Sequence, residues 1–255
     1  IRDQFSGSNG FAFAPKMSKT GNAMLYINPH TTFYFRPEIH MQSNEGLNTY
    51  GAVTWGQFFI YQGFNEFCGW MHTSNNVDVA DMYAEKITNL NKTIYYTFDK
   101  KLYPIGKKNI EIKYLENGIL KTKKFETYFT HNGPIMAERD GRWISLKHKN
   151  QNPVSLVQSW VRTKAKSFED YQKAMDLTAN ASNNTIYADA KGNIAYWHGN
   201  FIPKRDTTYN WNEPVDATTS ATAWKGLHPV NESIHSYNPV NGWLQNCNST
   251  PFTVA

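Results

Sequence analysis

The stretch SGSNGFAFAPKMSKTGNAMLYINPH, Ser6 to His30, decides the fold. Within it, FAFA at 11–14 and AMLYIN at 23–28 are apolar runs separated by Gly, Pro and Asn residues, a pattern typical of two short strands. The first run begins just after Ser8, which is flanked by a glycine and an asparagine. On these residues alone, Ser8 is more simply a turn residue than a nucleophile, because a nucleophilic serine needs a base beside it.

Composition favours a globular, strand-rich protein. The chain has 255 residues, of which 40% are hydrophobic and 15% aromatic, enough for one large domain or two small ones. The net charge of +5 comes partly from the lysine-rich segment 100–124, which favours solvated strand faces over nucleic-acid binding. No apolar run approaches the length of a membrane span. Cys68 and Cys247 form no metal-binding motif, so we expect two free, buried thiols.

Local signals place further elements along the chain. TTFYF at 31–35 reads as another strand, and Asn117-Gly118 marks a hairpin with lysine-rich arms. A helix is predicted over 167–180, where Ser167 and Asp170 resemble a capping box. A second hairpin is predicted over 183–199, and 203–229 reads as a long surface loop. These elements alone support an α+β domain.

The bond between Gly7 and Ser8 offers a route to chemistry without a catalytic triad. If that bond is cleaved, the freed α-amino group of Ser8, with a pKa near 7.7–8.0, can serve as the base for its own hydroxyl. Gly7 also allows the strained backbone from which the hydroxyl could attack the preceding carbonyl.

Four ordered blocks carry a resemblance to a known family. They are GSNGFAFAP…GNAMLYINPH, WMHTS at 70–74, TIYADAKGNIAYW at 185–197 and NGWLQNCNSTP at 241–251. Together they resemble the start of the catalytic β chain in the penicillin acylase family of N-terminal nucleophile hydrolases. The resemblance implies a four-layer αββα fold. It also implies that residues 1–7 end a removed spacer and that 8–255 are the N-terminal part of the β chain, a single domain truncated at its C-terminus.

The same resemblance assigns site residues. Ser8 becomes the nucleophile, and His30 a residue that orients its amine and hydroxyl. His30 stands where cephalosporin and acyl-homoserine-lactone acylases have histidine, so the chain resembles those groups more than penicillin G acylases. The backbone N–H of Ser74 and the side-chain amide of Asn248 become the two donors of an oxyanion hole.

Two further implications concern substrate and metal. Thr31 and Gln62 take the places of phenylalanines that line the acyl pocket of penicillin G acylases, which makes a phenylacetyl substrate less favoured. The family often has acidic calcium ligands after Ser74, but here Asp78 is the one carboxylate, beside Asn75 and Asn76. No cofactor is required, and calcium at Asp78 stays an open alternative.

The resulting hypothesis is a hydrolase that cleaves the amide bond of an N-acylated small molecule through an acyl-enzyme on Ser8. The resemblance implies a separate α chain and the remainder of the β chain as partners, and a periplasmic or secreted location. Two alternatives remain open: a catalytically inactive family member or unprocessed precursor that only binds ligands, and an unrelated aromatic-rich β protein that binds carbohydrate.

Overall fold

The chain forms two compact units. The computed structural model describes residues 7–32, 35–148, 152–180 and 183–250. Unit 1 comprises Ile1–Val79, Asn150–Ile202 and Leu227–Ala255, and unit 2 comprises Ala80–Lys149 and Pro203–Gly226. The family resemblance implies a single domain over 8–255, whereas the contacts within the chain separate two units, and each of the four sheets lies within one unit.

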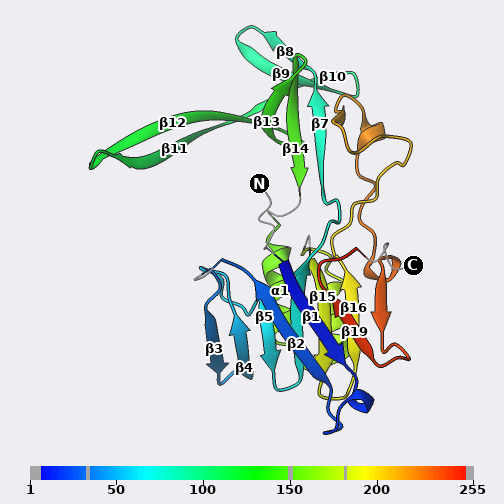
Figure 1. Cartoon of the computed structure of the whole chain (residues 1–255). Coiled ribbons are helices and arrows are strands. Elements are labelled where there is room, and N and C mark those ends of the chain that lie inside the picture. Colours follow the sequence, from blue (N-terminus) through cyan, green and yellow to red (C-terminus); the bar gives the residue numbers. More distant parts are fainter. Residues whose placement is uncertain (1–6, 33–34, 149–151, 181–182, 251–255) are drawn as a thin grey trace. The chain divides into compact units, whose positions relative to one another are not determined.

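Two sheets build unit 1 (Figure 1). The three-stranded sheet has the order β19-β1-β2, with β1 at Gly7–Phe13, β2 at Met24–His30 and β19 at Trp243–Asn246. The seven-stranded sheet has the order β18-β16-β15-β6-β5-β4-β3. Its strands are β3 (Glu38–Ser43), β4 (Leu47–Ala52), β5 (Gln62–Asn65), β6 (Cys68–Ser74), β15 (Asn183–Asp189), β16 (Ile194–His198) and β18 (His235–Tyr237).

Strand β1 packs one face against the seven-stranded sheet. Its burial alternates along the strand, so that Ser8, Gly10 and Ala12 are buried and their neighbours are not. Ala12 belongs to an apolar cluster with Met71 of β6 and Ile186 of β15. Because strand side chains alternate with a period of two, Ser8 faces the same layer between the sheets as Ala12 does.

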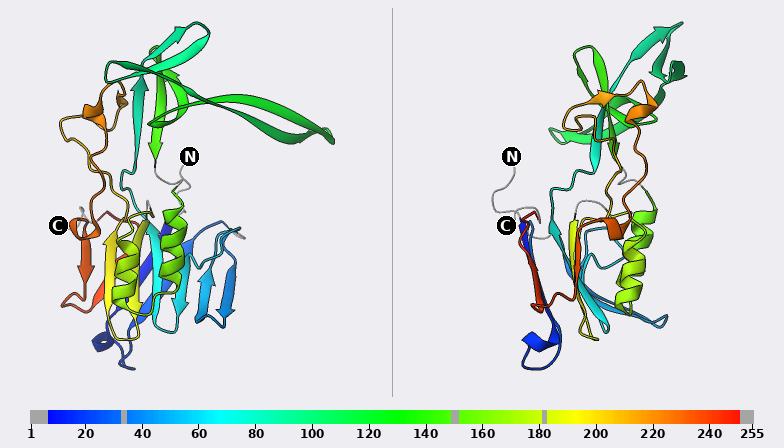
Figure 2. Two further views of the ribbon diagram at one scale, coloured as in Figure 1. Left: turned by 180° about the vertical axis from the view of Figure 1, so that it is seen from behind. Right: turned by 90° about the vertical axis from the view of Figure 1, so that its right-hand side faces the viewer.

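Two helices cover the other face of the seven-stranded sheet, so unit 1 has a helix–sheet–sheet order (Figure 2). Helix α2, Phe168–Met175, begins as predicted with Ser167 as its N-cap, whose Oγ accepts a hydrogen bond from the Asp170 N–H at 3.1 Å. The main apolar cluster lies beneath this layer, with Trp70, Tyr171, Tyr187 and Trp197 all buried.

Helix α1, Val154–Thr163, is not predicted from the sequence. It buries its polar side and exposes apolar residues. Its buried residues are polar: Gln158, Ser159, Arg162 and Thr163. Its exposed residues include apolar ones, namely Val154, Leu156, Val157 and Val161. A helix usually turns its apolar stripe inward, so this arrangement places polar groups against the sheet.

Unit 2 is built from two further sheets. The six-stranded sheet has the order β11-β12-β13-β14-β7-β17, and the three-stranded sheet has the order β10-β9-β8. The strands are β7 (Ala80–Glu85), β8 (Ile87–Leu90), β9 (Thr93–Phe98), β10 (Lys101–Pro104), β11 (Gly106–Glu116), β12 (Ile119–Thr130), β13 (Gly133–Arg139), β14 (Arg142–His148) and β17 (Val215–Asp216). Short 3-10 helices complete the chain at Pro15–Met17, Ser220–Thr222 and Val230–Glu232.

Both predicted hairpins are confirmed. Strands β11 and β12 turn at Asn117 and Gly118, which have φ values of 53° and 77°, as a type I′ turn requires. The lysines of this ribbon are solvated, and some of them pair with glutamates, for example Lys124 with Glu111 at 2.8 Å. Strands β15 and β16 form the second hairpin. Within 203–229 the chain is mostly turns and loop, as predicted, apart from β17 and the 3-10 helix Ser220–Thr222.

Two expectations are wrong. No strand covers TTFYF in its described part, because Thr31 and Thr32 have no regular structure and residues 33–34 lie outside the described residues. The two cysteines are free, but only Cys68 is buried, whereas Cys247 is exposed. Cys247 follows the last residue of β19, where the chain leaves the sheet and turns toward solvent.

The two thiols should react differently. Burial raises the pKa of Cys68 to about 12, so the reactive thiolate is scarce at pH 8, and its side chain is also shielded from reagents. We expect iodoacetamide to label Cys247 alone in the native protein and both cysteines in guanidinium chloride, as measured by peptide mass spectrometry. Native labelling of Cys68 at the rate of Cys247 would contradict the buried placement, and a Cys247→Ser variant provides the control.

Candidate active site

The Ser8 side chain and backbone are held by two short contacts. Its Oγ donates a hydrogen bond to the carbonyl oxygen of Gly7 at 2.6 Å, and its N–H donates to Oδ1 of Asn248 at 2.6 Å. The hydroxyl is therefore beside the carbonyl group of the residue that precedes it. This is the proximity that attack on the Gly7–Ser8 peptide bond requires.

Glycines permit the close packing around Ser8. A Cβ atom at Gly7 would meet Oδ1 of Asn248 at 2.8 Å, closer than real Cβ contacts. One at Gly10 would meet the side chains of Ile186 and Met71 at 2.3 and 2.4 Å. Absence of a side chain at these two positions thus lets β1 approach both Asn248 and the seven-stranded sheet.

Asn248 connects the serine to the end of β6. Its Nδ2 donates to the carbonyl oxygen of Ser74 at 3.1 Å, while its Oδ1 accepts from Ser8. Its backbone has a φ of 72°, which asparagine tolerates better than most residues, and its N–H donates to Oδ1 of Asn246 at 2.9 Å. Three of the predicted site residues, Ser8, Ser74 and Asn248, are therefore linked by hydrogen bonds.

His30 lies next to this group but contacts other partners. Gly7 and His30 are cross-strand neighbours in the β1–β2 ladder. The Nε2 atom of His30 lies 2.8 Å from Oδ1 of Asn28 and 3.3 Å from Nδ2 of Asn9. The expected hydrogen bond from His30 to Ser8 is not present among the described residues, since the imidazole is engaged by these two amides instead.

The two residues predicted to line the acyl pocket have different environments. Gln62, at the start of β5, is 1% exposed, and its Oε1 accepts from the His72 N–H at 3.4 Å. Its Nε2 has no hydrogen-bond partner within the described structure. Thr31 is exposed just after β2. Their roles toward a substrate stay predictions.

A buried amide network, which the sequence analysis missed, supports Ser74 and Asn248. Asn184 is 0% exposed, and its Nδ2 lies 3.0 Å from Thr73 Oγ1, 3.1 Å from Asn246 Oδ1 and 3.3 Å from the Ser74 carbonyl oxygen. Oδ1 of Asn246 also accepts from Thr73 Oγ1 at 2.6 Å. All these residues lie within or beside the resemblance blocks, but nothing in their residue types distinguishes them from ordinary strand and turn positions.

Two histidines border this region and are neutral for the same reason. Burial lowers the pKa of His198, whose Nδ1 is 2.7 Å from Oδ1 of Asn184. Burial also lowers the pKa of His72 well below 6.5, and the nearby charge of Arg162 lowers it further. A neutral imidazole can both donate and accept one hydrogen bond, which suits an uncharged framework around Ser74.

Carboxylates offer little support for a metal site. Asp78, the predicted calcium ligand, is exposed between β6 and β7, and no group of three or more His, Cys, Asp or Glu side chains suited to a metal occurs in the described parts of the chain. Asp81, at 2% exposure, accepts from Arg205 Nε at 2.8 Å, so a side-chain cation neutralises it. Calcium at Asp78 stays a prediction.

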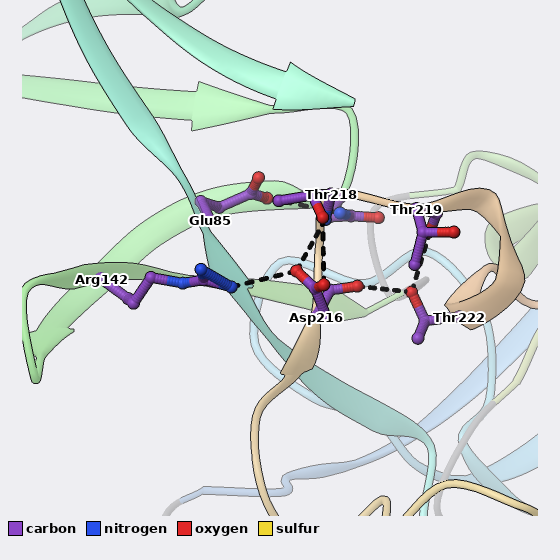
Figure 3. Close-up of polar contacts among 7 residues, drawn as sticks. Glu85, Arg142, Asp216, Thr218, Thr219 and Thr222 are labelled. Carbon is purple, nitrogen blue, oxygen red and sulfur yellow. Dashed lines mark hydrogen bonds and ion pairs between the residues drawn. The ribbon is translucent and has the colours of Figure 1, made fainter. Parts of the chain in front are cut away.

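Two further acidic groups of unit 2, Glu85 and Asp216, are likewise held by protein donors. Oε1 of the buried Glu85 accepts from Thr130 and Ser145 hydroxyls, each at 2.7 Å. Figure 3 shows Arg142 reaching Asp216, and the two side chains form an ion pair with a 3.0 Å separation. The Thr218 hydroxyl donates to the same carboxylate, and the Thr222 hydroxyl donates to the Asp216 carbonyl oxygen. These contacts join β14, β17 and the following turn, and they are typical of a structural network.

A model of the penicillin amidase family matches residues 1–255, so the chain belongs to the penicillin amidase family. Penicillin G acylase of Escherichia coli is 28% identical over 275 residues, covering 98% of this chain and 31% of that protein. An acyl-homoserine lactone acylase PvdQ of Pseudomonas syringae is 26% identical over 215 residues, covering 78% of this chain and 27% of that protein. The chain thus spans less than a third of the length of these relatives.

Structural comparison confirms the fold. Thermostable penicillin G acylase from Alcaligenes faecalis superposes with a TM-score of 0.83 at 23% identity, covering 96% of this chain and 44% of that one. The predicted fold class, that of N-terminal nucleophile hydrolases, is therefore correct. In the described residues, no helix is long and apolar enough to cross a membrane.

Removing the buried amide of Asn246 should destabilise the protein. An Asn246→Ala substitution leaves the buried Thr73 hydroxyl without its acceptor and removes one of the acceptors of Asn184 Nδ2, at an expected cost of about 1–3 kcal/mol. Urea unfolding followed by tryptophan fluorescence measures this change. The control is Asn44→Ala, an exposed residue in the turn between β3 and β4. Equal unfolding free energies for the two variants would contradict a supporting role for Asn246.

Proposed function

We propose that this chain is the part of a self-processing amidohydrolase that carries the nucleophile, and that it cleaves the amide bond of N-acylated small molecules. The observation that carries the proposal is the pair of 2.6 Å contacts of Ser8, from its Oγ to the Gly7 carbonyl oxygen and from its N–H to Asn248. Relatives named penicillin G acylase and acyl-homoserine lactone acylase support the same reaction class.

Processing would begin with attack of Ser8 Oγ on the carbonyl carbon of Gly7. The Gly7–Ser8 C–N bond breaks, the nitrogen takes up a proton, and an ester forms between the Gly7 acyl group and Oγ. Water hydrolyses that ester, which leaves a carboxylate at Gly7 and restores the hydroxyl of Ser8. The new α-amino group then lies where the Ser8 amide nitrogen lies, within reach of Oδ1 of Asn248.

Turnover would use the same atoms on a substrate amide. The α-amine accepts the hydroxyl proton while Oγ attacks the substrate carbonyl, and the proton then passes to the departing amine. The Ser74 N–H and Asn248 Nδ2 stabilise the oxyanion. Nδ2 carries two hydrogens, so one can remain on the Ser74 carbonyl oxygen while the other points to the reacting oxygen. Water hydrolyses the acyl-enzyme without a metal or organic cofactor.

Further parts of the proposal rest on family membership. A separate α chain and the remainder of a β chain complete the enzyme, and the protein acts in the periplasm or outside the cell. His30 orients the α-amine after processing, when release of Gly7 frees space beside the imidazole.

The decisive experiment substitutes the nucleophile in the full-length gene product. Ser8→Ala should abolish both cleavage at Gly7–Ser8 and hydrolysis of N-acyl substrates, because no other atom can form the ester. Intact mass and N-terminal sequencing measure the first effect, and amine release measures the second. Ser43→Ala, an exposed serine at the end of β3, is the control. Retained hydrolysis in Ser8→Ala would overturn the proposal, and an uncleaved wild-type protein would favour a ligand-binding role.

Loss of one oxyanion donor should slow the chemistry without preventing substrate binding. Asn248→Ala is expected to lower kcat by about 10²–10³ with KM little changed, because the donor acts chiefly in the transition state. Steady-state kinetics on correctly processed protein measures both constants. A large rise in KM with unchanged kcat would instead make Asn248 a substrate-binding residue.

A further inference from the structure

The ribbon formed by β11 and β12 extends away from the other strands of unit 2 (Figure 1, Figure 2). Strand β12 pairs with β13 at Phe129 and Thr130, and the rest of the ribbon has no third strand beside it within the described structure. An isolated two-stranded ribbon is marginally stable in water. A ribbon of this kind is therefore expected either to be polar on both faces or to be covered by a partner.

One face of the ribbon carries an uncovered apolar stripe. Cross-strand neighbours project to the same face, and the register sets Ile110 opposite Phe125 and Ile112 opposite Lys123. Tyr114, two positions further on, continues the stripe toward the turn. All four apolar side chains of the stripe are exposed. An exposed apolar patch bordered by charged groups is typical of an interaction surface.

The tip of the ribbon is apolar on both faces. Leu115 and Leu120 are cross-strand neighbours on the face opposite to the stripe, whereas Ile119 lies on the same face as the stripe, beside the turn. These three side chains are 72%, 63% and 64% exposed. A flat protein surface covers only one face of a ribbon. A tip that is apolar on both faces instead suits insertion into an apolar medium that surrounds it.

Lysines lie behind this tip on both faces. Residues 106–130 contain six lysines and three glutamates, a net charge of +3. Each glutamate pairs with a lysine: Glu111 with Lys124 at 2.8 Å, Glu116 with Lys121, and Glu126 with Lys107. Lys113 and Lys123 form no ion pair in the described part of the chain, and they lie on opposite faces. Unpaired positive charge therefore follows the apolar tip on each side of the ribbon.

This order of groups matches the layers of a lipid surface. The apolar tip includes the last two cross-strand pairs before the turn, a length of roughly 7 Å at about 3.3 Å per residue. Interfacial elements bury their apolar groups about 5–10 Å into the boundary between headgroups and acyl chains. The lysines follow at the depth of the headgroups, and their long side chains can reach the phosphates from there. Anionic lipid attracts such clusters of lysines.

We propose that the β11–β12 ribbon binds the surface of a bilayer that contains anionic lipid. Leu115, Ile119 and Leu120 insert between the headgroups, and Lys113 and Lys123 contact the lipid phosphates. The apolar stripe on one face lets the ribbon tilt onto the surface. This inference is independent of the proposed amide hydrolysis, because no residue of the ribbon takes part in that reaction.

Vesicle binding by the full-length gene product tests the proposal. Cosedimentation is measured with vesicles of phosphatidylcholine alone and with vesicles of phosphatidylcholine and phosphatidylglycerol in equal parts. We expect the anionic vesicles to be bound at least about tenfold more tightly, and this binding to weaken as the NaCl concentration rises. Equal binding to the two kinds of vesicle, or binding to neither, would overturn the proposal.

Variants of the ribbon separate charge from insertion. Lys113→Gln combined with Lys123→Gln should weaken binding to the anionic vesicles by roughly fivefold for each lysine removed. Leu115→Ser combined with Leu120→Ser should weaken it by at least about tenfold, because two apolar side chains no longer insert. Binding that is unchanged in both double variants would overturn the role of the ribbon.

Matched controls come from the β9–β10 hairpin of the same unit. Lys100, Lys101 and Leu102 are exposed there, as are the residues changed in the ribbon. Lys100→Gln combined with Lys101→Gln, and separately Leu102→Ser, should leave vesicle binding unchanged. Control variants that bind as weakly as the ribbon variants would overturn the assignment of binding to the ribbon. Circular dichroism checks the folding of every variant.

Hydrogen exchange of the wild-type protein distinguishes lipid from a protein partner, and it decides the outcome even where a variant does not fold. An uncovered two-stranded ribbon opens readily, so we expect fast amide exchange over 113–123 in solution and slower exchange on anionic vesicles. Slow exchange before vesicles are added would mean that another part of the full-length protein covers the ribbon, which would overturn the proposal. Exchange that stays fast on the vesicles would overturn it as well.

Discussion

The close approach of β1 to the seven-stranded sheet is the constraint on which the candidate site depends. Gly10 allows it, because any Cβ there would overlap the side chains of Met71 and Ile186. With the strand this close, its alternation turns the Ser8 side chain toward the layer between the sheets. Ser8 and Asn248, 240 positions apart, come within 2.6 Å because β1 pairs with β19 in a register that sets Gly10 opposite Asn246 and so brings the residues after β19 beside Ser8.

Rigidity behind the site comes from hydrogen bonds between amides rather than from charges. Asn184 and Asn246 lie between Thr73 and Asn248 and satisfy one another at distances near 3 Å. Neutral partners need no counter-ion and incur a smaller desolvation cost than buried ions. Such a network fixes the positions of Ser74 and Asn248 without placing a buried charge beside them.

Sequence reasoning succeeded where the determinants are local. The turn at Asn117-Gly118 and the Ser167 cap depend on residues within a few positions, and both form as predicted. Prediction from the sequence fails where tertiary contacts determine which side of an element is buried. Helix α1 was missed because its polar residues face inward, so its apolar pattern does not mark the buried side. Site residues came from the family resemblance, since Ser8 and Asn248 taken alone are ordinary turn residues.

Near Ser74, the polar groups on the two faces of the seven-stranded sheet differ in whether they are hydrogen-bonded within the protein. Toward β1 and β19, the amides of Asn184 and Asn246 are paired within the protein. Toward α1, Arg162 and His72 keep unpaired nitrogen atoms at less than 5% exposure. Both faces are buried, so solvent access does not explain the difference. Paired groups hold a fixed geometry, whereas unpaired groups retain binding capacity at a cost in stability. The division therefore corresponds to one face that holds Ser74 and Asn248 in place and another that keeps unpaired polar atoms beside a small cavity.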